Sequence, residues 1–176
     1  MGLAKSLGLL LITPALLISM ACTQRTANDA SYKDQVQKSL EQAELKDVTV
    51  SEDRDKNTIT LGGKVHSEDA KNEAGRVAQA NAGNRIIANE ISVQPVGAES
   101  QAKDVASNLD DGIEKNYKAA LIEKGLDKEH IRFSAKNGVL TLKGSVKNAS
   151  MKQEAQRVAK STPNVQQVVN QVEVKR

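Results

Sequence analysis

Apolar residues along this chain recur in two spacings that alternate in a fixed order. Spacings of four residues are typical of one face of an α-helix, and strict alternation is typical of a strand. The pattern predicts a helix, a short strand, a second strand, a second helix from Ser67 and a last strand, over residues 32–40, 48–50, 58–65, 67–82 and 86–93. The predicted order is therefore α-β-β-α-β.

The whole pattern occurs twice, 81 residues apart. The motif Thr-Leu-x-Gly-x-Val at residues 60–65 returns at residues 141–146. Likewise, Lys-x-Glu-Ala-x-Arg-Val-Ala at residues 71–78 returns at 152–159. Over residues 57–93, 12 of 37 positions are identical at this offset with no gap. A repeat of this length is a small domain used twice, and it favours binding over catalysis.

We therefore predict an α+β protein of two tandem domains, each a three-stranded mixed sheet with two helices on one face. The predicted domains are residues 32–96 and 113–176, joined by residues 97–112. The helical spacing of residues 105–117 favours an extension of the following helix across this connection, whereas Gly112 favours a break. The sequence is compatible with both arrangements.

Three short features refine the predicted strands and turns. Asn137-Gly138 between two strand-like runs predicts a two-residue hairpin turn. Gly63 and Gly144 lie within strands, so we interpret them as structural residues that permit a close approach of the chain or mark a bulge.

The N-terminal 21 residues have the layout of a bacterial secretory signal: Lys5, an apolar run over residues 7–20, and small residues before Cys22. Ile18 to Cys22 resembles a lipobox, in which Cys22 becomes the lipidated first residue of the mature protein. Residues 22–31 then form a polar tether. Ser19-x-Ala21 also suits ordinary signal peptidase, which would leave a protein free in the periplasm. Cys22 is the single cysteine, so no internal disulfide forms.

The two predicted domains differ strongly in charge. Residues 32–96 carry 9 basic and 11 acidic side chains, a net charge of −2, whereas residues 113–176 carry 13 and 6, a net charge of +7. The connection 97–112 has a net charge of −3. Such asymmetry bears on partners rather than on fold.

The repeated motifs resemble the BON domain family, known from bacterial osmotically induced periplasmic proteins and from nodulation-related proteins. The resemblance rests on the hairpin ending in Gly-x-Val, the helix core Ala-x-x-Val, and the closing strand over residues 164–174. In the first copy Asn84 stands where the second has Val165, a departure from the family's ending. The resemblance implies envelope maintenance, contact with phospholipid membranes and no catalytic activity. In Gram-negative lipoproteins, Asp after the lipidated Cys commonly means retention in the inner membrane. Thr23 follows Cys22 here, so in a Gram-negative cell the resemblance to such signals favours an outer-membrane anchor.

No catalytic, cofactor or metal-binding set stands out in the sequence. His66 and His130 lack any metal-ligand spacing and are interpreted as exposed loop residues. Gly62-Gly63 lacks the spacing of a phosphate loop. An export signal and a single Phe with no Trp argue against nucleic-acid binding.

The basic surface of the second domain is the one feature that predicts a partner. Lys152 and Lys160 share a helix face with Arg157 beside them, and Lys143 and Lys147 come from the preceding strand and turn. We expect these five residues to bind anionic phospholipid head groups. The alternatives are an ordinary solvated face, or a soluble periplasmic stress protein that binds other envelope proteins as a chaperone or scaffold.

Overall fold

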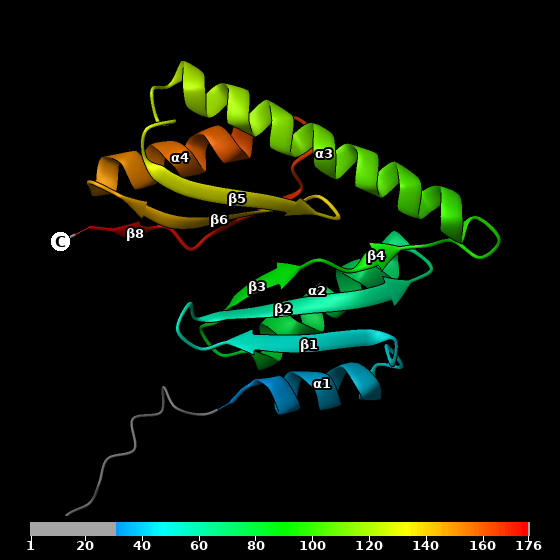
Figure 1. Ribbon diagram of the computed structural model, residues 1–176. Helices are drawn as coiled ribbons and strands as arrows, with labels where there is room; N and C mark the ends of the chain where they lie inside the picture. Colours follow the sequence, from blue (N-terminus) through cyan, green and yellow to red (C-terminus); the bar gives the residue numbers. More distant parts are fainter. Residues whose placement is uncertain (1–30, 176) are drawn as a thin grey trace, which may run out of the picture. The chain divides into compact units, whose positions relative to one another are not determined.

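The computed structural model describes residues 31–175, and the predicted order of elements is present twice (Figure 1). The first repeat has helices α1 and α2 and strands β1 to β4, over Lys33–Gln42, Glu68–Asn81, Val48–Asp53, Thr58–Val65, Ile86–Asn89 and Ser92–Val93. The second repeat has helices α3 and α4 and strands β5 to β8, over Glu99–Glu123, Ala149–Ser161, His130–Lys136, Val139–Val146, Gln167–Asn170 and Glu173–Val174. The predicted tandem α+β architecture is confirmed.

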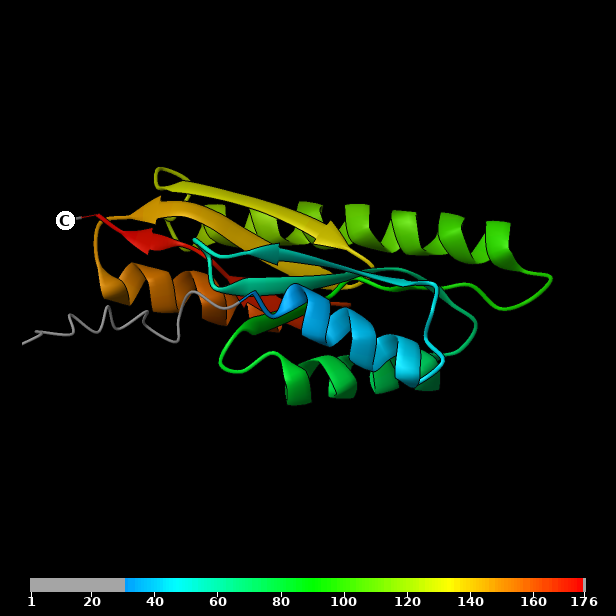
Figure 2. The same cartoon turned by 90° about the horizontal axis from the view of Figure 1, so that it is seen from below.

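Each repeat forms a mixed sheet with its two helices on one face (Figures 1 and 2). The central strand, β2 or β6, pairs antiparallel with the preceding strand and parallel with the two that follow. Leu40 of α1, Ala74 of α2 and Leu61 of β2 belong to one buried cluster, which places both helices over the same face. Tyr117, Ala155 and Leu142 occupy the corresponding cluster of the second repeat.

The last strand of each repeat is interrupted rather than continuous as the alternation predicted. In the first repeat, Glu90 and Ile91 separate β3 from β4, and both strands pair with β2. The gap lies opposite Gly62-Gly63, where the positive φ of Gly63 (+89°) disturbs the ladder. Ile91 turns its side chain into the core and is fully buried. The three predicted strands are therefore observed as four.

Gly63 and Gly144 hold two neighbouring strands close together. A Cβ on Gly63 would lie 2.1 Å from Asp47 O, and one on Gly144 would lie 1.9 Å from His130 O. Gly144 also has a φ of +102°, which residues with side chains rarely adopt. Both positions require glycine for local geometry.

Helix α3 runs unbroken through Gly112, so the sequence interpretation of a break there is wrong. It spans 25 residues, and its first three turns occupy most of the predicted connection 97–112. Gly112 lies inside the helix with no heavy atom within 4 Å of the place where a Cβ would stand. Glycine weakens an exposed helix by about 0.5–1 kcal/mol but does not stop it when the neighbouring turns persist.

The two repeats meet along the outer edges of β3 and β7, a contact that we call the seam. The side-chain amide of Gln167 donates to Ile87 O (2.5 Å) and accepts from Asn89 N (3.0 Å), so it satisfies the open edge of β3. Ala88 and Val169 pack together in a small buried cluster. These two residues are 81 positions apart, so equivalent strands meet at equivalent points and the seam has approximate two-fold symmetry.

Polar side chains extend the seam on either side of this cluster. Gln171 Nε2 donates to Thr58 Oγ1 (2.9 Å), and Asn137 Nδ2 donates to Glu90 O (2.8 Å). Lys136 and Glu90 form an ion pair at 3.3 Å. Together these contacts make the described part of the chain a single compact unit.

Candidate functional site

The structure separates Lys143 from the other predicted basic residues. Leu142 faces the core beneath α3 and α4. Because neighbouring side chains of a strand point to opposite faces, Lys143 points away from the helices. It lies opposite Arg132 of β5, and both side chains are exposed on that sheet face.

Two of the predicted residues already have carboxylate partners. Lys147 Nζ lies 3.1 Å from Glu129 Oε1, and Glu129 is 4% exposed. Arg157 pairs with Glu154 of the same helix. The first repeat has the same pair at the equivalent positions, Arg76 with Glu73, so this pair is a feature of the repeat and not of the second domain alone.

Lys152 and Lys160 of α4 differ in exposure. Lys152 is half-buried at the flank near β7, where its backbone carbonyl accepts from Asn170 Nδ2 at 3.4 Å. Its positive charge lowers the pKa of Glu173, after the larger effect of Lys56. Lys160 is exposed and, among the described residues, forms no ion pair. Of the five predicted residues, the structure thus brings only Arg157 and Lys160 together on the outer face of α4.

Helix α3 also carries basic side chains that point outward. Ile113, Tyr117 and Leu121 are buried against the sheet, which turns Lys115, Lys118 and Ile122 outward. Ile122 is 56% exposed, unusual for a large apolar side chain.

The two helices lie side by side, because Tyr117 Oη donates to Ala155 O at 3.2 Å. Burial raises the pKa of Tyr117, which keeps its hydroxyl protonated as the donor. We call the exposed outward residues of the two helices the basic helical surface: Lys115, Lys118, Ile122, Arg157 and Lys160; Lys118 and Ile122 lie on the flank of α3 that faces β5.

Four positions of the basic helical surface differ in charge between the two repeats. At an offset of 81, Lys115, Lys118, Ile122 and Lys160 replace Asp34, Gln37, Glu41 and Gln79. These four positions sum to −2 in the first repeat and to +3 in the second. The change at these four positions is five charge units, and the segment 128–136 differs from its equivalent 47–55 by the same amount, +2 against −3. The fold is the same in both repeats, so it does not require this change.

An apolar notch of about 250 Å³ lies beside this surface at the C-terminal end of α3. Leu126, Ile131 and Phe133 line it, together with Lys118, Ile122 and the carboxylate residues Asp127 and Glu129. The ring of Phe133 packs edge-on against Tyr117, with 5.0 Å between centroids. The arrangement places positive charge next to an accessible apolar recess.

The described residues hold no cluster of three or more His, Cys, Asp or Glu side chains that could bind a metal ion. His66 is exposed, and its Nδ1 lies 2.9 Å from Gln94 O. His130 is exposed in β5. None of the helices within residues 31–175 is both long and apolar enough to cross a membrane.

Comparisons with known proteins agree with the repeat. The BON domain model matches residues 28–95 and again residues 109–176. Osmotically-inducible protein Y of Escherichia coli (strain K12) is 26% identical over 132 residues, which cover 74% of this chain and 64% of that protein. The chain thus spans somewhat less than two thirds of that relative.

Two solved structures of CdsD, a structural protein of the type III secretion system of Chlamydia trachomatis, also align. Both have a TM-score of 0.32 and 15% identity; one alignment covers 81% of this chain and 67% of CdsD, the other 82% and 61%. Similarity at this level carries no functional argument.

Proposed function

Because the chain belongs to the BON domain family, we propose that it is a non-catalytic protein of the bacterial cell envelope that docks on anionic phospholipid membranes. The basic helical surface of the second repeat would make the contact, and the first repeat would be its packing partner. The similarity to an osmotically inducible protein supports a role in envelope integrity under stress.

The observation that supports membrane docking is the divergence of the two repeats at this surface. Elements that hold the fold are shared, including the Arg–Glu pair of α2 and α4. At three solvent-facing positions, an acidic or neutral residue of the first repeat corresponds to a lysine of the second. At a fourth position, Glu41 corresponds to the exposed Ile122. Basic side chains that flank an exposed apolar residue suit the surface of an anionic bilayer.

The expected free energy of membrane binding suits a protein that is already held near its membrane. Each basic side chain near an anionic surface contributes about 1 kcal/mol. Because Arg157 is paired with Glu154, the three lysines of the surface supply about 3 kcal/mol. That free energy corresponds to a dissociation constant of about 6 mM. Such weak binding is effective only when an anchor raises the local concentration.

We propose that Cys22 carries this anchor as a lipidated N-terminus in the outer membrane. Cys22 lies outside the described residues, so the support is the lipobox-like sequence before it and Thr23 after it.

Vesicle co-sedimentation of residues 23–176 without the lipid tests the docking surface. We expect binding to anionic vesicles at low salt and its loss at high salt, because the contact is electrostatic. Charge reversal by Lys115→Glu with Lys160→Glu should weaken binding at least about 30-fold, since it removes about 2 kcal/mol and adds repulsion. Lys38→Glu with Lys46→Glu in the first repeat makes the same change in net charge and should have a much smaller effect.

Equal losses in both double variants would show that net charge, not this surface, drives binding. No binding to anionic vesicles would remove the membrane proposal and favour the protein-binding alternative, a periplasmic chaperone or scaffold. Globomycin treatment of cells, followed by detection of an unprocessed precursor, tests the lipid on Cys22 separately.

A further inference from the structure

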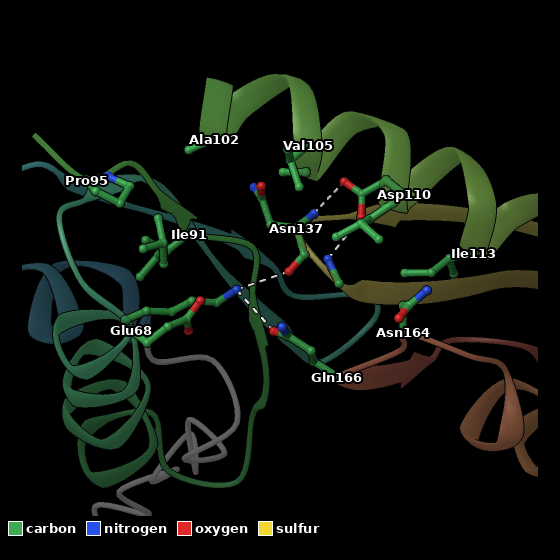
Figure 3. Close-up of a pocket in the computed structure, with 15 residues that line it drawn as sticks. Glu68, Ile91, Pro95, Ala102, Val105, Asp110, Ile113, Asn137, Asn164 and Gln166 are labelled. Carbon is green, nitrogen blue, oxygen red and sulfur yellow. Dashed lines mark hydrogen bonds between the residues drawn. The ribbon is translucent and has the colours of Figure 1, made fainter. Parts of the chain in front are cut away.

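A cavity of about 280 Å³ lies beside the seam, between the first turns of α3 and the end of the first repeat (Figure 3). Ile91 and Val93 line it from the first repeat, and Val105, Leu109 and Ile113 line it from α3. Val105 is 58% exposed and Leu109 is 45% exposed. This part of α3 therefore presents an apolar face that the protein itself only partly covers.

The other end of the cavity holds a buried positive charge. Lys71 is only 7% exposed. Its Nζ donates to Asn137 O at 3.0 Å and to Gln166 Oε1 at 3.4 Å, and both acceptors are neutral. No carboxylate lies within ion-pair distance of Lys71 among the described residues. A buried ammonium without a paired anion is costly and needs compensation.

The repeat shows that the fold does not require this burial. The equivalent residue, Lys152, is only half-buried. Lys71 differs because the hairpin residue Asn137 and the side chain of Gln166 cover it from the second repeat. The burial is thus produced where the two repeats meet.

Two carboxylates near the cavity, those of Glu68 and Asp110, partly offset the positive charge of Lys71. Burial lowers the pKa of Lys71, and the charges of Glu68 and Asp110 oppose that shift. Asp110 is already engaged, because its two carboxylate oxygens accept from Asn137 N (2.7 Å) and Gly138 N (3.0 Å). Glu68 is exposed and lines the edge of the cavity.

We propose that this cavity binds an alkyl carboxylate, with the carboxylate at Lys71 and the alkyl chain along Val93, Val105 and Leu109. An anionic head group would supply the missing partner of Lys71 as a charge-assisted hydrogen bond. The volume of about 280 Å³ and the apolar side chains of α3 suit an unbranched alkyl chain, and we take a chain of eight carbons as the probe. The ligand class is therefore a medium-chain fatty acid.

Titration calorimetry of residues 23–176 with sodium octanoate at about pH 7.5, where carboxylates are ionised, tests the site. We expect one molecule to bind per chain. Hexanoate, which lacks two methylenes, should bind roughly 15-fold more weakly, since each buried methylene contributes about fourfold.

Variants distinguish the two ends of the site. Lys71→Met should weaken octanoate binding about tenfold or more, through loss of a hydrogen bond between charged groups. Glu68→Gln should strengthen it, because a nearby negative charge is removed. Val93→Thr should weaken binding while it keeps the side-chain shape, and Val174→Thr at the equivalent position of the second repeat should leave it unchanged. Circular dichroism of each variant checks that it is folded.

Two results would overturn the proposal. One is octylamine binding as tightly as octanoate, since the carboxylates rather than Lys71 would then dominate. The other is octanoate affinity unchanged in folded Lys71→Met and Val93→Thr. Neither result depends on vesicle binding, because the cavity and the basic helical surface share no residue.

Discussion

The unbroken course of α3 leads to a stability prediction that separates two kinds of glycine. Replacing Gly112 by alanine should stabilise the protein. Gly112 lies in the interior of a 25-residue helix, and an added Cβ meets no atom within 4 Å. The substitution removes backbone freedom from the unfolded chain without cost to the folded one. We expect a gain of about 0.5–1 kcal/mol.

The opposite result is expected for the same substitution at Gly144. A Cβ there would stand 1.9 Å from His130 O, and the φ of +102° lies outside the range of residues with side chains. Backbone strain of this kind costs about 1–3 kcal/mol, before β5 and β6 move apart. We expect a loss of about 3 kcal/mol or more for Gly144→Ala.

Thermal unfolding followed by circular dichroism at 222 nm measures both effects. For a chain of this size, 1 kcal/mol shifts the midpoint by about 2–4 °C. Gly112→Ala should therefore raise the midpoint by about 1–4 °C, and Gly144→Ala should lower it by at least about 6 °C. A lower midpoint for Gly112→Ala would contradict a continuous helix and would indicate a turn at that residue. The apolar wall of the cavity would then lose its support.

Three further substitutions test contacts in the core and the seam. Gln167→Ala should cost about 1–3 kcal/mol in urea unfolding, because the edge of β3 loses its donor and acceptor. Tyr117→Phe should cost about 1 kcal/mol in the same assay, because it removes one buried hydrogen bond but keeps the ring. Burial alone would raise the pKa of Glu52, but hydrogen bonds from Ser31 and Tyr32 and the charge of Arg85 hold it below its ordinary value of 4.5. The ionised carboxylate of Glu52 therefore stabilises the fold above about pH 4.5, and this stabilisation is lost as the pH falls through the folded pKa of Glu52. The variant Glu52→Gln should be less stable than the parent at pH 7 and equally stable in strong acid.

The arrangement within each repeat could be predicted because its signals are local. Asn137 and Gly138 both have positive φ, 48° and 82°, as the hairpin signal requires. Ser67 and Asn148 cap their helices, at 3.2 Å from Ala70 N and 2.9 Å from Met151 N. These features depend only on neighbours in the sequence.

The seam could not be predicted, because it depends on residues that look like ordinary polar surface. Gln167 is one polar residue in an alternating strand pattern. Nothing in that pattern indicates that its side-chain amide forms hydrogen bonds with the edge of another strand. Lys71 belongs to a motif that is identical in both repeats, yet only one copy is buried. The candidate membrane surface was only half predicted for the same reason: helix spacing found Lys160, but Ile122 stands out only when it is aligned with Glu41.

The two repeats together separate what the fold needs from what a partner needs. Asn89 and Asn170 are identical, and each donates its side-chain amide to the backbone carbonyl of the equivalent lysine, Lys71 O at 2.9 Å and Lys152 O at 3.4 Å. Such shared contacts join helix to strand in both repeats, so selection for folding explains them. The side chains of these two lysines differ in burial: that of Lys71 is buried at the seam, and that of Lys152 is half-buried. Differences between copies of one fold are therefore the places to test for partners: the alkyl carboxylate that we propose at the seam, and the anionic membrane that we propose at α3 and α4.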